Sequence, residues 1–379
     1  MLWLSLIIFL LVSALCLEVA IGARRIAQLK KVCAQSASGR IKVSVIIPAC
    51  NEAGTLESAL DSVLKVSYPD LEVIVVNDRS TDGTASILEH MTNRHPALRV
   101  VQIAALPPGW LGKNHALHQG VQLASGDYIL FTDADVTFAP GSIGMAVAYC
   151  EAHQVDHLTL LFDILARTPL LAMLVLSFSV NFMARFKPWK VAKSKRYYLG
   201  AGGFNLVRRS AYFEAGTHAA IPMAVLDDLM LGRLIKQHGF TQHVLYGRDL
   251  VRVEWYRSTP EMMQGLMKNA FAAFDFSLIQ LAAVTMLMLV LRVWPWIALF
   301  ATHGAAWWLN LFTVFAGLAL YIDFIRADGQ SYRCLLFAPI VALLELAIWW
   351  RASISTLVRG GIVWRGTYYP LGELRRMRL

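Results

Sequence analysis

The feature that most constrains the fold is residues 128–135, where a run of apolar residues leads directly into two carboxylates. Residues 128–131 read Tyr-Ile-Leu-Phe, and such a run is typical of a strand covered on both faces. Asp133 and Asp135 follow at the carboxyl end of this strand, where open α/β sheets bind their ligands. Because unpaired buried charge is costly, the two acids need a partner, and hard oxygen ligands suit Mg²⁺ or Mn²⁺. The stretch predicts a metal site in an α/β sheet, with a solvated Asp-Ala-Asp turn as the alternative.

The surrounding residues 42–154 alternate between strand and helix patterns. Strands that alternate with helices predict a Rossmann-like, mostly parallel sheet with helices on both faces. We expect a helix that Thr81 or Asp82 caps, and a later helix that runs from Asp227 to a C-terminal glycine at Gly239. The expected strands are residues 43–47, 71–76, 98–103 and 128–132, and the other expected helices are residues 55–65 and 112–124.

Polar residues follow each of the four expected strands. The carboxyl ends of parallel strands share one edge of a sheet, so these residues should converge on a single cleft. A base and ribose would need an acceptor such as Asp78, a backbone-lined slot such as Pro48 and Ala49, and the Glu52 carboxylate. Lys113 could offset phosphate charge. Each residue also has a structural alternative, as a helix cap, a turn residue or a solvated side chain.

Long apolar segments predict an integral membrane protein. The 379 residues are 56% hydrophobic with a mean hydropathy of +0.50, which is too apolar for a purely soluble protein. Residues 1–23 form an apolar anchor, and Arg24 and Arg25 after it place the amino terminus outside by the positive-inside rule. A cleaved signal peptide fits less well, because the amino end has no basic side chain. The net charge of +9 lies largely beside apolar stretches, which favours anionic lipid headgroups over nucleic acid as a partner.

The remaining apolar segments do not give a consistent topology. Residues 170–184 predict a helix in the membrane interface, followed by a basic segment from Lys187 to Arg196. Residues 278–350 contain about three candidate spans, of which Arg292 and Pro295 interrupt the first. The basic tail, residues 351–379, should be cytoplasmic, yet three crossings would place it outside. One span must therefore be re-entrant or divided.

Several motifs together resemble the family 2 glycosyltransferases, whose catalytic domain has the GT-A fold. The resemblance covers residues 42–270 and rests on residues 45–52, residues 75–84, residues 109–114, the Asp-Ala-Asp (DxD) motif and the acidic pair Asp227-Asp228. The anchor, the carboxyl-terminal spans and residues 363–369 look most like the lipid-directed branch of the family. That branch includes ceramide glucosyltransferases and the hopanoid-associated and carotenoid-acid enzymes.

The resemblance implies a role for each matching residue. Asp228 would be the catalytic base, although without the resemblance its position at a helix N-terminus would explain the charge. Asp135 would ligate Mg²⁺ or Mn²⁺. The residues implied in binding the nucleotide-sugar donor are Pro48, Ala49, Glu52, Asp78, Lys113, Asp133 and Asp227.

The implied activity is inverting, metal-dependent transfer of one sugar, from a donor such as a UDP-hexose to a membrane lipid, giving a glycolipid. The protein would lie in a bacterial cell membrane with its catalytic domain in the cytoplasm. The chain has no exact Q/R-x-x-R-W motif, which leaves the acceptor contacts open and disfavours a processive polysaccharide synthase. A polyprenyl-phosphate sugar transferase is a further alternative, and so is a non-catalytic membrane scaffold. The residues expected on the acceptor and membrane side are Gly202, Gly203, Gln264, Trp364 and Arg365.

Overall fold

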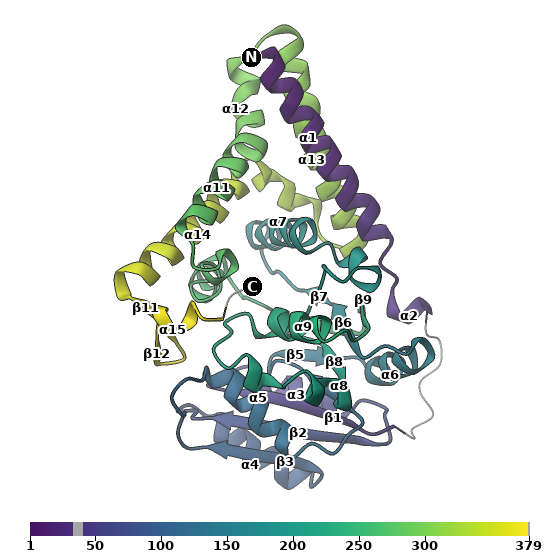
Figure 1. Ribbon diagram of the computed structural model, residues 1–379. Coiled ribbons are helices and arrows are strands. Elements are labelled where there is room, and N and C mark those ends of the chain that lie inside the picture. The colour runs from purple at the N-terminus through teal and green to yellow at the C-terminus, as the bar shows by residue number, and fades with distance from the viewer. Residues whose placement is uncertain (33–40, 378–379) are drawn as a thin grey trace. The chain divides into compact units, whose positions relative to one another are not determined.

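The computed structural model describes residues 1–32 and 41–377 and divides the chain into two compact units (Figure 1). The helical unit comprises Met1–Arg25, Leu165–Lys187 and Trp255–Gly360. The sheet unit comprises Ile26–Ile164, Pro188–Glu254 and Gly361–Leu379, of which residues 33–40 and 378–379 are not described. The boundaries predicted for the catalytic domain, residues 42–270, stay a prediction.

A seven-stranded sheet forms the core of the sheet unit, in the order β3-β2-β1-β4-β8-β6-β9. The pairs among β1, β2, β3 and β4 are parallel, as the sequence predicts. Strand β8 is antiparallel to both β4 and β6, so the sheet is mixed but mostly parallel. The strands are β1 (Val43–Ala49), β2 (Leu71–Asp78), β3 (Leu98–Ile103), β4 (Tyr128–Phe131), β6 (His157–Leu161), β8 (Asn205–Arg208) and β9 (Gln242–Tyr246).

Amphipathic helices pack on this sheet. Helix α3 buries Leu56, Leu60 and Val63, which recur at the spacing of one helix face. Helix α4 begins at Thr84, and Gly83 occupies its cap position. The prediction that Thr81 or Asp82 is the cap residue is therefore wrong. The Asp82 carboxylate nevertheless accepts the Thr84 N–H at 2.9 Å. The helices of this unit are α2 (Leu29–Val32), α3 (Leu56–Leu64), α4 (Thr84–Arg94), α5 (Gly112–Gln122), α6 (Ser142–His153), α8 (Arg209–Glu214), α9 (Asp227–Gln237) and α15 (Leu371–Leu374), with 3₁₀ turns η1 (Pro188–Lys193) and η2 (His218–Ala220).

Helix α9 ends as predicted. His238 is its cap residue and Gly239 follows with φ +84°, the left-handed conformation that glycine adopts without steric cost. Two smaller sheets complete this unit: β5 (Val136–Phe138), β10 (Val251–Val253) and β7 (Asp163–Ile164) form one, and β11 (Gly361–Trp364) and β12 (Thr367–Pro370) form an antiparallel hairpin.

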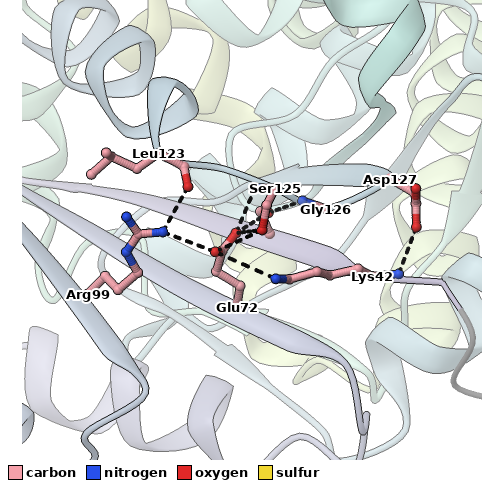
Figure 2. A network of polar contacts seen from close by, with 8 residues as sticks. Lys42, Glu72, Arg99, Leu123, Ser125, Gly126 and Asp127 are labelled. Carbon is pink, nitrogen blue, oxygen red and sulfur yellow. Dashed lines mark hydrogen bonds and ion pairs between the residues drawn. The ribbon is translucent and has the colours of Figure 1, made fainter.

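A polar network joins the amino ends of the strands, at the sheet edge opposite the predicted site (Figure 2). The Glu72 carboxylate accepts from the Ser44 hydroxyl at 2.6 Å and from the Ser125 N–H at 2.9 Å, and Arg99 Nη1 lies 3.2 Å away. Burial alone would raise the pKa of Glu72, but these hydrogen bonds and the nearby Lys42 lower it. The carboxylate form of Glu72 therefore links β1, β2, β3 and the loop before β4.

Replacing Glu72 with glutamine should destabilise the sheet unit at neutral pH. Hydrogen bonds to a charged group are worth about 1.5–3 kcal/mol, so a loss of that order is expected. Because the pKa of Glu72 is lowered by folding, its contribution is present above the ordinary glutamate pKa and is lost as pH falls through the lowered value. Thermal midpoints of wild type and Glu72→Gln should thus differ at pH 7 and converge in acid. Glu57→Gln, on an exposed residue, is the control, and an equal shift in both variants would contradict the account.

The helical unit contains five helices long and apolar enough to cross a membrane. Helices α1 and α13 lie side by side (Figure 1). Ser5 and Asn310 are hydrogen-bonded at 2.9 Å near the start of both helices, and Arg24 pairs with Asp323 at 2.6 Å near their ends, so the two helices run parallel. The elements are α1 (Leu2–Arg24), α7 (Pro169–Phe186), α10 (Thr259–Gly265), η3 (Ala272–Phe274), α11 (Leu278–Met288), a π-helical turn η4 (Leu289–Val293), α12 (Trp294–Ala301), α13 (Gly304–Asp328), η5 (Tyr332–Phe337) and α14 (Ala338–Arg359).

A partly buried arginine joins four segments of the helical unit. The predicted break at Arg292 is a π-helical turn, in which one extra residue widens the helix. The Arg292 guanidinium donates to Glu345 of α14 at 2.9 Å, to Asn181 of α7 at 3.0 Å, to Ser177 at 2.6 Å and to the Tyr321 hydroxyl of α13. Every partner lies on a helix other than the one that carries Arg292, so the cluster fixes how these helices pack.

Candidate functional site

The expected site lies where the strand order reverses. Strands β2 and β3 lie on one side of β1, and β4 lies on the other, so a crevice opens beyond the carboxyl ends of β1 and β4. Pro48 and Ala49 end β1, and Asp133 and Asp135 follow β4. The structure therefore brings the first and fourth predicted loops together.

A glycine loop lies across the end of β4. The Asp133 N–H donates to the Gly202 carbonyl at 3.1 Å, and the Thr132 hydroxyl donates to the Gly203 carbonyl at 2.9 Å. A Cβ at Gly202 would stand 2.6 Å from Asp133 Oδ2. A Cβ at Gly200 would stand 1.8 Å from the backbone oxygen of Asp228, so this approach of two backbones requires glycine.

The same loop fixes the carboxylate of Asp228. The Gly202 N–H donates to Asp228 Oδ2 at 2.8 Å, and the Leu229 N–H donates to Oδ1 at 2.8 Å. Burial, together with the neighbouring Asp227, raises the pKa of Asp228 to about 7. A carboxyl group with such a pKa exchanges its proton readily near neutral pH, which is what a general base requires.

Lys113 connects the two acidic motifs. Its Nζ lies 2.8 Å from Asp133 Oδ1 and 3.1 Å from Asp227 Oδ2. Burial would lower the pKa of Lys113, but the surrounding carboxylates outweigh this effect and raise it, so the lysine stays charged. A small pocket is lined by Lys113, Thr132, Asp133, Gly202, Asp227 and Asp228, among others. The pocket is thus lined by five residues that the sequence predicted for the site, which are Lys113, Asp133, Gly202, Asp227 and Asp228.

Asp135 has carboxylates as its main charged neighbours. Burial, then Asp133 and Glu52, raise the pKa of Asp135 to about 7, and Lys113 only partly offsets this. Within residues 1–32 and 41–377, no three acidic, histidine or cysteine side chains form a complete metal-ligand set. A cation here would therefore need oxygens from water or from a bound ligand as further ligands.

The first two loops border the side of the crevice where the sequence leads us to expect a nucleotide. The Asn51 side-chain oxygen accepts from the Thr81 N–H at 2.7 Å, and the Glu52 N–H donates to the Thr84 hydroxyl at 2.9 Å. Asn51 therefore ties the two loops together, whereas Thr55 occupies the cap position of α3.

Asp78 is less accessible than its expected role suggests. Its side chain is only 4% exposed, and Arg79 binds both of its oxygens, at 2.7 and 2.9 Å. Gly112 packs directly against the Asp78 carboxylate, since a Cβ there would lie 2.3 Å from Oδ2. Arg79, which we did not predict as a site residue, therefore occupies both oxygens of the Asp78 carboxylate.

Three residues expected on the acceptor and membrane side lie in two parts of the fold. Arg365, in the turn of the β11–β12 hairpin, donates to the Asn51 carbonyl at 3.1 Å and binds the carboxylate of Glu52, a residue expected to bind the donor. Trp364 belongs to β11 of the same hairpin. Gln264 lies on α10 in the helical unit.

Comparison with known families finds a match that lies mainly in the sheet unit. Residues 44–216 match the family model described as Glycosyl transferase family 2. Residues 44–216 are therefore similar to a family 2 glycosyltransferase domain. The match includes the crevice loops and both aspartates of the Asp-Ala-Asp motif, and it ends before Asp227 and Asp228.

Curated relatives support the same family over a shorter stretch. "Probable glycosyltransferase YdaM" of Bacillus subtilis is 39% identical over 98 residues, which is 25% of this chain and 23% of that protein. "4,4'-diaponeurosporenoate glycosyltransferase" of Staphylococcus aureus (strain USA300) is 41% identical over 97 residues, which is 25% of this chain and 24% of that protein. The chain thus matches about a quarter of the length of these relatives.

A solved structure supports the fold of the glycosyltransferase domain. It is described as "Mannosyltransferase PcManGT from Pyrobaculum calidifontis in complex with GDP-Man and Mn2+". It has a TM-score of 0.54 and 20% identity, and the alignment covers 93% of this chain and 99% of that one. The predicted α/β GT-A fold with apolar helices at both ends of the chain is confirmed.

Proposed function

We propose that the protein is an inverting, metal-dependent glycosyltransferase that moves one sugar from a nucleotide donor, such as a UDP-hexose, to a membrane lipid. The observation that carries this proposal is the convergence of Asp133, Asp227 and Asp228 around Lys113 at the crevice. The relative named for 4,4'-diaponeurosporenoate and the apolar helices favour a lipid acceptor, with a hydroxyl or carboxylate as the reacting group.

The side chains present suit an in-line displacement at the anomeric carbon of the sugar. The acceptor oxygen forms a bond to this carbon while the bond to the diphosphate oxygen breaks. For a hydroxyl acceptor, the Asp228 carboxylate takes the proton, and its two backbone hydrogen bonds hold it in one orientation. Lys113 and the N-terminus of α5 offset negative charge on the diphosphate.

The acidic side chains would supply part of the ligand set of a divalent cation, and oxygens of the donor or of water would complete it. Asp133 and Asp135 lie two residues apart, and Glu52 adds a third carboxylate to their surroundings. We propose that Asp135 ligates Mg²⁺ or Mn²⁺ and that Asp133 contacts the donor. When bound, the cation would stabilise the charge of the departing diphosphate. The relative from Pyrobaculum calidifontis was solved with GDP-Man and Mn²⁺, which agrees with this choice of cation.

Binding calorimetry tests the donor site. UDP and GDP, each with and without Mn²⁺, would be titrated into the detergent-solubilised protein. We expect binding that depends on Mn²⁺ in the wild type and loss of that dependence in Asp135→Ala. Asp61→Ala, on the outer face of α3, is the control. Nucleotide binding that ignores both Mn²⁺ and Asp135 would contradict the assigned metal ligand.

We further propose that only three of the five apolar helices cross the membrane. Strands β6 and β8 are hydrogen-bonded neighbours, yet α7 lies between them in the sequence. Both ends of α7 must therefore lie on the same side of a membrane, because the basic segment after it is too polar to cross back. This argument supports the predicted interfacial position of α7.

The same reasoning applies to α14. The chain leaves the sheet unit after β10 and returns to it at β11, so the segment between makes an even number of crossings. The two-residue connection from α12 to α13 makes an outward and a returning span. Helix α14 then begins and ends on the side of the sheet unit, so it is the segment that does not cross.

This topology resolves the contradiction in the sequence. In this topology α1 crosses the membrane towards the cytoplasm, and α11 with α12 crosses back to the outside. Helix α13 then crosses towards the cytoplasm parallel to α1, in agreement with the Arg24–Asp323 pair. The amino terminus is then outside, and the basic tail is in the cytoplasm.

Cysteine labelling tests the orientation. In a background without the native cysteines, His303→Cys should react with an impermeant maleimide added outside, and Gly372→Cys should react only after the membrane is opened. Both positions are exposed within their own units. Labelling of Gly372→Cys from outside would mean that α14 crosses.

A further inference from the structure

The carboxyl-terminal hairpin, Gly361–Pro370, contacts all three loops that border the nucleotide side of the crevice. Arg365 holds the Asn51 carbonyl and the Glu52 carboxylate in the first loop. Arg79 Nη1 of the second loop lies 3.1 Å from the Thr367 hydroxyl. The Gly112 N–H, at the start of α5, donates to the Tyr369 hydroxyl at 3.1 Å, and Tyr369 is buried.

These contacts engage groups that a nucleotide would need. The sequence leads us to expect the Glu52 carboxylate at the base and ribose of the donor, and N–H groups at a helix N-terminus attract phosphate. In the structure, Arg365 binds the first of these groups and Tyr369 binds the second. The hairpin and a nucleotide would therefore compete for the same partners.

The backbone at these contacts is strained. Asn51 and Arg79 have φ of +56°, and Arg365 has φ of +49°, in the left-handed region that side chains other than glycine rarely adopt. Arg365 and Gly366 form the two-residue turn of the hairpin, a position that usually carries asparagine, aspartate or glycine. The left-handed backbone conformation does not favour arginine at position 365. We therefore attribute the arginine at this position to the contacts that its guanidinium makes.

We propose that the carboxyl-terminal hairpin is a gate on the nucleotide subsite, in which Arg365 binds Glu52 until a nucleotide displaces it. This proposal rests on the proposed function, because it needs a nucleotide at Glu52. It differs from the acceptor-side role expected for Arg365, because the guanidinium lies on donor-side residues. Binding of the donor would then break the Arg365–Glu52 ion pair, and release of the nucleotide product would allow the pair to form again.

Calorimetry with UDP and Mn²⁺ on the full chain in detergent tests the gate. Removing the competing guanidinium in Arg365→Ala should tighten UDP binding by about two- to fivefold, the range for a partly exposed ion pair. Arg365→Lys keeps the positive charge but lacks the two-pronged guanidinium. Its affinity for UDP should therefore lie between those of the wild type and Arg365→Ala. Arg376→Ala removes an exposed charge from the same tail and should bind UDP as the wild type does. Unchanged or weaker UDP binding by Arg365→Ala would overturn the gate.

Hydrogen exchange without nucleotide provides the second readout. In Arg365→Ala, exchange should become faster in residues 361–370 and in residues 50–53 together, whereas Arg376→Ala should change neither segment. Unchanged exchange in both segments would contradict the docking contact. Absence of UDP and GDP binding in every variant would count against the proposed function, whereas binding that is insensitive to Arg365 overturns the gate alone.

Discussion

Replacing Asp228 with asparagine should lower sugar transfer by about 10²–10⁴-fold while nucleotide binding stays close to that of the wild type. Asparagine has nearly the shape of aspartate and can still accept the Gly202 N–H through its oxygen. It cannot take a proton from the acceptor. The measurement compares turnover with nucleotide affinity in the same preparation. Asp61→Asn, at a half-buried position of α3 that pairs with Lys65, is the control for a general effect of removing one charge.

The pH profile separates a base from a structural role. The pKa of Asp228 is raised to about 7, so its carboxylate form is lost as pH falls below that value. Wild-type turnover should therefore rise with pH through about 7, and the residual turnover of Asp228→Asn should lack that step. An acid limb that persists in Asp228→Asn would assign the titration to another group.

Replacing Arg292 with methionine should destabilise the helical unit by about 3–5 kcal/mol, the cost of removing one partner from a buried ion pair. The change leaves the Glu345 carboxylate buried, with the Asn181 amide at 3.0 Å still bound to it. It also removes the donors that Ser177 and Tyr321 accept from. We expect a lower thermal midpoint in detergent and a lower yield of folded protein.

A double variant makes this prediction sharper. Arg292→Met combined with Glu345→Leu removes both charges, so it should be less destabilising than Arg292→Met alone. Arg351→Met, on an exposed face of α14, controls for the loss of an arginine. If Arg292→Met and Arg351→Met have equal thermal midpoints, the cluster does not hold the helices together.

The strands that the sequence predicted are those that local pattern determines. Residues 98–103 form β3 as expected, and Asp133 and Asp135 follow a buried strand. The sequence did not reveal β8, which is four residues long and is inserted antiparallel between β4 and β6. Its place depends on pairing Asn205 with Phe131, a contact between distant residues that no local periodicity records.

The membrane segments show a second limit. Length and composition make α7 and α14 about as apolar as the helices that we propose to cross the membrane. The proposal separates α7 by the pairing of β6 with β8 on either side of it, and α14 by the return of the chain to the sheet unit at β11, and only the fold supplies these observations. The hairpin was missed for a different reason, because the pair Arg365-Gly366 lacks the residue type that usually marks a tight turn.

The candidate site was predicted well where several residues had to act together. The expected convergence of Lys113 with Asp133 agrees with the structure, since parallel strands place their carboxyl ends at one edge. The contact of Lys113 with Asp227, which opens α9, did not follow from the strand pattern. Arg79 was not predicted, because its bidentate contact with Asp78 depends on a positive φ that the sequence does not show.

The most direct test of the proposed activity is a lipid-transfer assay. The detergent-solubilised protein would be incubated with a panel of nucleotide sugars, Mn²⁺ or Mg²⁺ and total membrane lipid, and the lipids would be read by mass spectrometry. We expect one lipid species to gain the mass of one sugar with the wild type and not with Asp228→Asn. A lipid that gains the sugar equally with both proteins, or repeated addition of sugars to one acceptor, would contradict single transfer by an Asp228-dependent enzyme.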